Sequence, residues 1–366
     1  MQSYMKEALT LAKKGEGFVN PNPLVGALII KDDRIIAKGY HKQFGGLHAE
    51  IEAFNNAKES VTGATMVVTL EPCSHYGKTP PCAQAIIDKK IKKVVIASKD
   101  PNPLVAGKGI AMLMSAGIEV DIGLMDAENK ALNAVFFKYI ENKEPFVLMK
   151  SAMTLDGKIA SVAWDSKWIT NQASRANVHY WRHKLSAIMV GVNTVIHDNP
   201  KLTARMDSDK VAQPLRVILD TEGIIPLDSY VCSSAQTYDT LVVIGEHVSK
   251  QREEAMRATG VKVHRTGLKA GQLDLKQLMK DLGRMGIDSI LLEGGSTVNY
   301  SALEAGIVDR VHMYIAPKMI GGAQALSPVG GIGKAKVADA YKLKLASVEH
   351  FDDDVLLDYH VVKEAV

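Results

Sequence analysis

The sequence predicts two consecutive α/β domains, covering residues 1–144 and 145–366. Three observations support this fold class. Short apolar runs, typical of buried strands, alternate with helical patterns along the chain. The 366 residues suffice for two ordinary domains, and 46% hydrophobic against 23% charged residues is a globular composition. A polar helical connector over 126–144 stops at Pro145, where a new apolar run begins, so the boundary falls there.

In the first domain, a helix is expected over residues 2–14, followed by a turn at 20–23. An apolar strand over 24–30 is turned back by Asp32 and Asp33, which predicts an antiparallel hairpin at the sheet edge. A helix follows His48. Further strands and helices are expected in alternation over 65–70, 82–89, 93–98, 110–116 and 119–122.

The second domain shows the same alternation and no repeat of the first. A turn at 191–194 follows one of its strands, and a polar loop over 198–205 comes next. Strands are expected over 146–150, 187–190, 216–219, 240–244, 289–292, 310–315 and 354–362, and helices over 172–184, 274–282 and 298–305.

Charge and cysteine content exclude several kinds of partner. The formal net charge is only +3, from 44 basic and 41 acidic residues, so nucleic acid is not an expected partner. No apolar run approaches the roughly 18 residues of a membrane span, and the chain begins with a polar helix. Two of the three cysteines belong to a motif described next, which leaves Cys232 alone and fits a reducing compartment. We therefore expect a cytoplasmic protein.

The segment 47–82 carries the residue types that zinc-dependent deamination needs. His48-Ala49-Glu50 is followed by Glu71-Pro72-Cys73 and, after eight further residues, by Cys82. A zinc ion held by one imidazole and two thiolates keeps a fourth position for water, which loses a proton near neutral pH. Zinc deaminases combine His-x-Glu with two cysteines, and the glutamate moves protons without binding metal. The pattern predicts His48, Cys73 and Cys82 as zinc ligands and Glu50 as the proton shuttle.

The spacing alone leaves a second interpretation open. Eight residues between the cysteines exceed the usual two, and His75 lies between them, so a closed structural site of two cysteines and two histidines is conceivable. Such a site would have no position for water. Glu50 favours the catalytic interpretation, because it falls on the expected first helical turn, where its carboxylate is able to face the metal.

In the second domain, Glu293-Gly294-Gly295-Ser296-Thr297 lies where a strand passes into a helix. Backbone amides at a helix N-terminus attract phosphate, and glycine lets the backbone approach it. Glycines also end strands for steric reasons, so the pattern alone does not settle a phosphate site. His179 reads as a packed or exposed side chain of the helix over 172–184, and His41 has no partner pattern.

Further motifs occur along nearly the full length of the chain. In the first half they are Asn22-Pro23-Leu24-Val25-Gly26, Pro72-Cys73-Ser74-His75-Tyr76-Gly77-Lys78-Thr79-Pro80-Pro81-Cys82, Asp100-Pro101-Asn102-Pro103 and Gly107-Lys108-Gly109. In the second half they are Lys150-Ser151-Ala152-Met153-Thr154-Leu155-Asp156-Gly157-Lys158, Trp168-Ile169-Thr170, Arg182, the segment 198–205, the segment 214–220 and Glu293-Gly294-Gly295.

In these motifs the chain resembles the bifunctional riboflavin biosynthesis family, in which the long cysteine spacing is itself characteristic. The resemblance implies an N-terminal zinc cytidine-deaminase-like domain fused to a C-terminal dihydrofolate-reductase-like domain. It also implies two consecutive reactions on one phosphorylated pyrimidine nucleotide. The 2-amino group of 2,5-diamino-6-ribosylamino-pyrimidinone 5′-phosphate is lost as ammonia, and NADPH then reduces the ribosyl group to a ribityl side chain.

The resemblance also implies roles for individual residues. Arg182 and Arg205 make sense as phosphate clamps, because a guanidinium offers paired donors to oxyanions, although either alone also fits a surface arginine. Lys150 and Asp198 are the groups expected to handle protons in the reduction. The implied NADPH contacts are Ala152, Trp168, Thr194, Asp198, Gly295, Ser296 and Thr297, and the implied substrate contacts are Asn22, Ser166, Arg182, Leu202, Arg205 and Glu293.

Two other classes of protein remain as alternatives. A cytidine, guanine or tRNA adenosine deaminase with an unrelated C-terminal domain would mostly use the short cysteine spacing, and the tRNA enzyme would need a basic surface. A zinc-stabilised nucleotide-binding module without activity would be expected to lack a ligand or the glutamate, and neither is missing here. The family resemblance further makes a homo-oligomer the expected state, while the group that selects NADPH over NADH is not identifiable.

Overall fold

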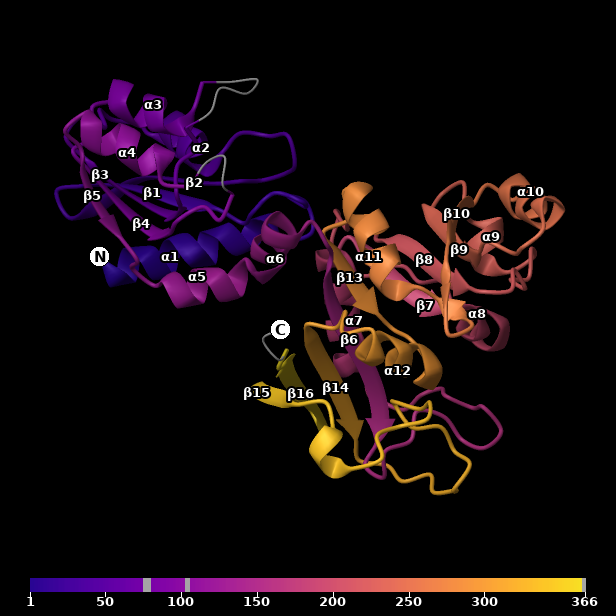
Figure 1. The fold of residues 1–366 in the computed structure, drawn as a ribbon. Coiled ribbons are helices and arrows are strands. Elements are labelled where there is room, and N and C mark those ends of the chain that lie inside the picture. The colour runs from indigo at the N-terminus through magenta and orange to yellow at the C-terminus, as the bar shows by residue number, and fades with distance from the viewer. Residues whose placement is uncertain (75–79, 103–105, 364–366) are drawn as a thin grey trace. The chain divides into compact units, whose positions relative to one another are not determined.

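The computed structural model describes residues 1–74, 80–102 and 106–363. The chain divides into two compact units, Met1–Lys143 and Glu144–Val366, each built around its own main sheet (Figure 1). Within the described residues, no helix is long and apolar enough to cross a membrane.

The first unit holds a five-stranded sheet in the order β2-β1-β3-β4-β5. β1 is antiparallel to β2 and β3, while β3, β4 and β5 are parallel. Asp32 and Asp33 join β1 to β2 with positive φ angles of 49° and 55°, which confirms the expected hairpin. The strands are β1 (Gly26–Lys31), β2 (Arg34–Tyr40), β3 (Thr65–Leu70), β4 (Lys93–Ser98) and β5 (Glu119–Ile122).

Helices cover both faces of this sheet (Figure 1). Alternate residues of β1 point to opposite faces, so Ile29 packs with the helices α2 to α4 and Leu28 packs with α1. The helices are α1 (Gln2–Ala12), the 3₁₀ turn η1 (Lys13–Gly15), α2 (Ala49–Asn56), α3 (Cys82–Asp88), α4 (Lys108–Ser115), α5 (Asp126–Leu132) and α6 (Ala134–Asn142). Because β3 and β4 are parallel, their carboxyl ends meet at one edge of the sheet.

The second unit holds a nine-stranded sheet in the order β10-β9-β8-β7-β13-β6-β14-β16-β15. Its strands run parallel from β10 to β14, and β16 and β15 add an antiparallel edge. They are β6 (Phe146–Thr154), β7 (Ala187–Gly191), β8 (Leu215–Asp220), β9 (Thr240–Gly245), β10 (Lys262–Thr266), β13 (Ser289–Leu292), β14 (Arg310–Ala316), β15 (Leu343–Phe351) and β16 (Asp354–Val361). A separate ribbon pairs β11 (Leu268–Lys269) with β12 (Gln272–Leu273).

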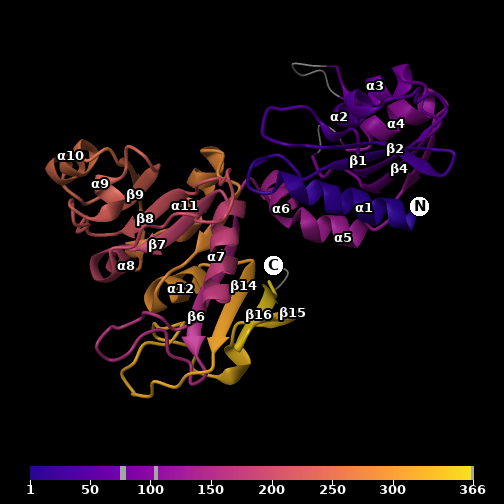
Figure 2. The ribbon, with the colours of Figure 1, turned by 180° about the vertical axis from the view of Figure 1, so that it is seen from behind.

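Two layers of helices enclose this sheet. Leu278 of α11 and Leu303 of α12 pack on one face, and Val178 of α7 packs with Tyr314 on the other (Figure 2). The helices are α7 (Gln172–Lys184), α8 (Val192–Asp198), α9 (Tyr230–Ser233), α10 (Lys250–Ala258), α11 (Leu275–Arg284), α12 (Ser296–Glu304) and the 3₁₀ turn η2 (Val337–Asp339).

The helices and strands expected from the sequence are present in the structure, which also contains elements that were not expected. The turn expected at 191–194 is instead the beginning of α8, which starts directly after β7. The strands β10, β11, β12 and β15 and the helices α9 and α10 were not expected. β15 is exposed along most of its length at the edge of the sheet, so it lacks the apolar alternation that marks a half-buried strand.

Candidate active sites

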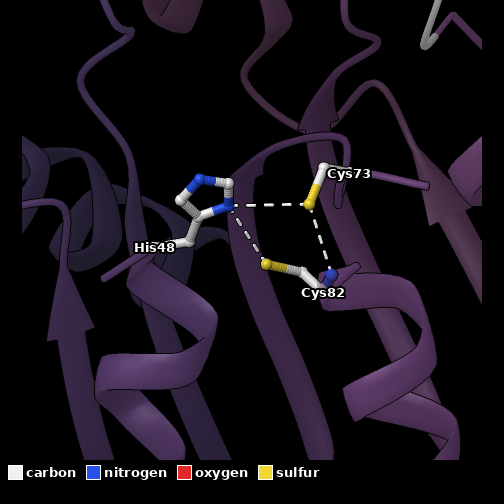
Figure 3. Close-up of side chains that lie close together, drawn as sticks. All are labelled: His48, Cys73 and Cys82. Carbon is white, nitrogen blue, oxygen red and sulfur yellow. Dashed lines mark hydrogen bonds between the residues drawn. The ribbon is translucent and has the colours of Figure 1, made fainter. Parts of the chain in front are cut away.

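Three potential metal ligands converge at the edge of the first unit's sheet (Figure 3). His48 is the N-cap of α2, Cys73 follows β3, and Cys82 is the first residue of α3. The Nδ1 atom of His48 lies 3.2 Å from Cys82 Sγ and 3.5 Å from Cys73 Sγ. Three separate elements therefore bring together the ligands that the motif predicts.

This donor set fits a zinc ion. Ligands about 2.0 and 2.3 Å from a tetrahedral zinc lie about 3.5 Å apart, close to the nitrogen–sulfur separations found here. Cys82 is buried, Cys73 half-buried and His48 exposed, so the group opens toward solvent on the histidine side. His75, the additional ligand of the closed structural alternative, lies outside the described residues.

Hydrogen bonding and burial shift the pKa values of the three potential ligands. A hydrogen bond with Cys82 lowers the pKa of Cys73 to about 4, with His48 adding to the effect. The same hydrogen bond and burial raise the pKa of Cys82, and the contact with Cys73 raises the pKa of His48 to about 9. At neutral pH these shifts favour a Cys73 thiolate beside a protonated His48, and zinc, which binds thiolates and neutral imidazole, would displace the protons of His48 and Cys82.

Glu50 lies in the first turn of α2 and is only 4% exposed. Burial raises the pKa of its carboxyl group, against the lowering effect of His48. Its side chain is also hydrogen bonded with Cys82, so it lies directly beside the ligand cluster. This is the position that the sequence predicts for the proton shuttle.

Asn22 and His41 lie beside the same cluster. The amide nitrogen of Asn22 is 3.1 Å from His41 Nε2, and His41 Nδ1 is 2.9 Å from the Leu47 carbonyl oxygen. The ring of His41 meets the ring of His48 edge-on, with centroids 5.8 Å apart. Since Nδ1 donates to Leu47, Nε2 accepts from Asn22. No sequence pattern marks His41, because its partners are not in a local motif.

The second unit contains a cavity of about 380 Å³ at the carboxyl ends of β7 and β8. Binding sites in open α/β sheets lie at such ends. Six residues predicted to contact cofactor or substrate line the cavity: Ser166, Thr194, Asp198, Gly295, Ser296 and Thr297.

Next to α12, the described residues that line this cavity are Gly295, Ser296, Thr297, Val298 and Ser301. The described lining residues include Asp198, Asp220 and Glu222 but no Lys or Arg, so recognition of an anion there relies on backbone N–H groups. The N-terminal turn of α12 is suited to this. A Cβ on Gly191 would lie 2.8 Å from a methyl group of Val298, so glycine allows β7 to end close against α12. These features fit the phosphates of a dinucleotide.

A second polar cluster lies around Glu293, two residues before the cavity-lining Gly295. The carboxylate of Glu293 forms a bidentate pair with Arg182, and Lys150 Nζ lies 3.7 Å from Oε2 of the same carboxylate. Burial opposes ionisation of Glu293, but Arg182 and Lys150 lower its pKa to about 2. Burial lowers the pKa of Lys150.

Arg205 extends this cluster on the exposed side. Its Nη1 donates to Thr203 Oγ1 over 2.9 Å, and its backbone N–H donates to His179 Nδ1 over 3.3 Å. Burial, Arg182 and Arg205 together lower the pKa of His179 to about 4. The basic side chains Lys150, Arg182 and Arg205 outnumber the single carboxylate of Glu293. The net positive charge of the cluster fits the binding of a phosphate group. His179 is thus a half-buried side chain of α7 that accepts a hydrogen bond from the backbone of Arg205, in keeping with the packed helix residue expected from the sequence.

The remaining predicted residues lie elsewhere in the second unit. Ala152 is half-buried on β6, Leu202 is buried with a positive φ of 52°, and Trp168 is 65% exposed with Arg175 stacked 4.6 Å from its ring centroid. The described lining of the 380 Å³ cavity does not include these three side chains. Their binding roles stay predictions.

Together, the folds and sites define a zinc deaminase domain followed by an α/β reductase domain. The model of the cytidine and deoxycytidylate deaminase zinc-binding region matches residues 1–98, and the model of the RibD C-terminal domain matches residues 145–357. The chain belongs to the RibD family of bifunctional deaminase/reductases of riboflavin biosynthesis. Zinc and NADPH are the cofactors of these two domains.

Full-length relatives support this membership. The riboflavin biosynthesis protein RibD of Actinobacillus pleuropneumoniae is 51% identical over 98% of this chain and 95% of its own length. The RibD protein of Escherichia coli K12 is 37% identical over 97% of each chain. The structure of the Thermotoga maritima deaminase/reductase covers 99% of this chain and 98% of its own, with 40% identity and a TM-score of 0.87. The resemblance stated from sequence is thus confirmed.

Proposed function

We propose that this chain catalyses two consecutive reactions on one phosphorylated diaminopyrimidine. The Thermotoga maritima relative is described as a diaminohydroxyphosphoribosylaminopyrimidine deaminase and a 5-amino-6-(5-phosphoribosylamino)uracil reductase. The observation that carries the proposal is the convergence of His48, Cys73 and Cys82 beside the buried Glu50. We assign deamination to residues 1–144 and reduction to residues 145–366.

In the deamination, His48, Cys73 and Cys82 hold zinc. When bound, zinc supplies the Lewis acidity that activates a water molecule for attack on the ring carbon bearing the 2-amino group. Glu50 takes a proton from the water and passes protons to the ring nitrogen and the departing amine. The carbon–nitrogen bond breaks, ammonia leaves, and the ring carbon keeps the oxygen as a carbonyl. Asn22, fixed by its contact with His41, contributes a polar contact to the pyrimidine ring.

In the reduction, the substrate is bound by five residues: Ser166, Arg182, Leu202, Arg205 and Glu293. The cation-rich cluster receives its 5′-phosphate. Arg182 donates Nε and Nη2 to Glu293, so Arg205 is the arginine with more donor capacity left for the phosphate. Glu293 thereby holds Arg182 in place at the edge of the cofactor cavity.

The cofactor is assigned to the 380 Å³ cavity. NADPH, when bound, supplies a hydride to the anomeric carbon of the substrate. We assign its phosphates to Gly295, Ser296 and Thr297 at the start of α12 and further contacts to Ala152, Trp168, Thr194 and Asp198. Opening of the ribosyl ring turns the anomeric carbon into an imine carbon, and after hydride addition the imine nitrogen takes up one proton. Lys150 and Asp198 are the groups we assign to proton handling.

One experiment tests both assignments. The zinc-loaded chain receives the diaminopyrimidine ribosylamino phosphate with and without NADPH, and ammonia release and NADPH oxidation are followed together. We expect ammonia without NADPH, and NADPH oxidation in equal amount once the cofactor is added. Ammonia release without any oxidation would refute the reductase assignment, and neither signal would refute both.

We also propose a reducing, cytoplasmic environment and a homo-oligomeric state. Cys73, Cys82 and Cys232 are all unpaired, and zinc binding by Cys73 and Cys82 requires them to stay reduced. The edge strand β15 exposes Leu345 and Val348, which supports an apolar contact with another copy. Light scattering of the purified chain tests the second point, and a monomer at micromolar concentration would refute it.

A further inference from the structure

The carboxylate of Glu71 is buried between two segments of the first unit. Glu71 directly follows β3 and is 4% exposed. Its Oε2 accepts hydrogen bonds from the backbone N–H groups of Asp100 (3.3 Å) and Gly107 (3.0 Å). Its Oε1 accepts from Gly109 (3.0 Å) and Ile110 (3.3 Å). An ionised carboxylate has about four acceptor positions, so the four donors use its full capacity.

These donors include the N-terminal turn of α4. Gly107 is the N-cap of that helix and has a φ of 75°, a conformation that glycine adopts without strain. A negative charge at a helix N-terminus is stabilised by the helix dipole and satisfies N–H groups that lack a partner within the helix. Glu71 therefore acts as the cap of α4 from a distant part of the sequence.

The same contact also fixes the backbone next to Cys73. A Cβ on Gly109 would lie 2.0 Å from the carbonyl oxygen of Pro72, so the first turn of α4 packs directly against the residue that precedes the zinc ligand. The backbone N–H of Glu71 donates to the carbonyl oxygen of Ser98 at the end of β4. The chain that carries Cys73 is thus held on one side by β4 and on the other by α4.

We propose that Glu71 is a positioning residue for the zinc site, which holds Cys73 in reach of His48 and Cys82 by joining the end of β3 to the start of α4. This role rests on the proposed zinc deaminase site and explains two motifs together: the glutamate before Pro72-Cys73 and the glycines of Gly107-Lys108-Gly109. The four hydrogen bonds that the Glu71 carboxylate accepts from described residues all come from backbone N–H groups, so its proposed effect on the metal acts through Cys73.

Replacing Glu71 by glutamine tests this role. A glutamine keeps the shape but has one acceptor oxygen, and its NH₂ group would face two backbone N–H donors. Loss of a group that orients a metal ligand typically costs 10- to 100-fold in metal affinity. We therefore expect the holoprotein carrying Glu71→Gln to release zinc to a chromogenic chelator about 10- to 100-fold faster than the unaltered chain.

Two controls accompany this measurement. Glu128→Gln changes an exposed glutamate on α5 and is expected to release zinc at the unaltered rate. NADPH oxidation with the deaminated pyrimidine as substrate reports on the second unit of the same chain and is expected to stay within about twofold. Added zinc is expected to restore ammonia release by Glu71→Gln, because Glu50 is intact, whereas a purely structural defect would not respond to zinc.

Zinc release at the rate of Glu128→Gln would overturn the proposal. If Glu71→Gln does not fold, Gly109→Ala tests the same contact, because it keeps the Glu71 carboxylate but places a methyl group against the Pro72 carbonyl oxygen. Zinc release from Gly109→Ala at the unaltered rate would also overturn the proposal. Measurements of zinc binding and ammonia release by the unaltered chain distinguish a failure of this inference from a failure of the proposed function. Tight zinc binding without ammonia release would refute the deamination, while leaving the comparison of zinc release rates meaningful.

Discussion

Arg182 and Glu293 form a bidentate ion pair, with Nε to Oε1 at 2.7 Å and Nη2 to Oε2 at 2.8 Å, although they are 111 residues apart in the chain. Arg182 lies on α7 and Glu293 directly follows β13, so the pair joins a helix to the strand end beside the cofactor cavity. The ion pair is expected to affect the free energy of unfolding of the second unit and its dependence on pH.

Replacing Glu293 by glutamine is expected to destabilise the second unit. Two buried cations, Arg182 and Lys150, would lose their carboxylate, and removing one partner of a buried pair typically costs about 3 to 5 kcal/mol. Chemical denaturation measures this loss, with Glu254→Gln, an exposed glutamate on α10, as the control. Equal stability of the two variants would contradict the structural importance of the pair.

The same carboxylate predicts a pH dependence. The pKa of Glu293 falls from 4.5 to about 2 in the folded chain, so its ionisation contributes stability that is present above pH 4.5. This contribution is lost as the pH falls through 4.5 toward 2. The difference in unfolding free energy between the unaltered chain and Glu293→Gln should therefore shrink over that range. A difference that stays constant with pH would show that the carboxylate is not the origin of the effect.

Glu50→Gln is expected to abolish ammonia release while leaving zinc bound. The amide cannot take up a proton from water, and general acid–base groups contribute about 10²- to 10⁴-fold to the rate. Zinc content by atomic absorption and NADPH oxidation with the deaminated substrate are expected to match the unaltered chain. Retained ammonia release would sink the assignment of the shuttle.

Asp198→Asn is expected to impair reduction and spare deamination. Asp198 ends α8 and faces the cavity beside Ser166, with Ser166 Oγ 3.4 Å from its Oδ1. Steady-state rates of both reactions on the same preparation measure the effect, and Asp207→Asn in the neighbouring exposed loop serves as the matched control. The reverse pattern, with only deamination impaired, would mean that the two activities are assigned to the wrong domains.

Arg216 offers a test of stability away from the reacting groups. This arginine on β8 is fully buried and donates to Thr240 Oγ1 and to the carbonyl oxygens of Val231 and Tyr238. Arg216→Met would remove these hydrogen bonds from a buried site, at about 1 to 3 kcal/mol each. Denaturant midpoints should show a loss of at least about 3 kcal/mol, whereas the exposed Arg284→Met should show little change. If Arg216→Met unfolds at the same denaturant concentration as Arg284→Met, water molecules replace the hydrogen bonds of the Arg216 guanidinium group.

The sequence predicts those parts of the molecule whose signals are local. The hairpin turn at Asp32 and Asp33 and the spacing of His48 and Glu50 are contained in a few residues, so the edge hairpin and the metal site were both expected. The bond between Asn22 and His41 and the four contacts of Glu71 join segments that only the fold brings together. Arg182 was expected to bind phosphate, but its contacts with Glu293 depend on the register of β13 against β7.

The separate origins of the three zinc ligands link metal supply to folding. Because α2, the end of β3 and the start of α3 contribute one ligand each, the complete site exists only in the folded first unit. A ligand that binds only the folded state adds about 2.7 kcal/mol of stability at a concentration 100 times its dissociation constant. Zinc supply would therefore add to the folding stability of the first unit, which holds all three ligands, and not to the stability of the second unit.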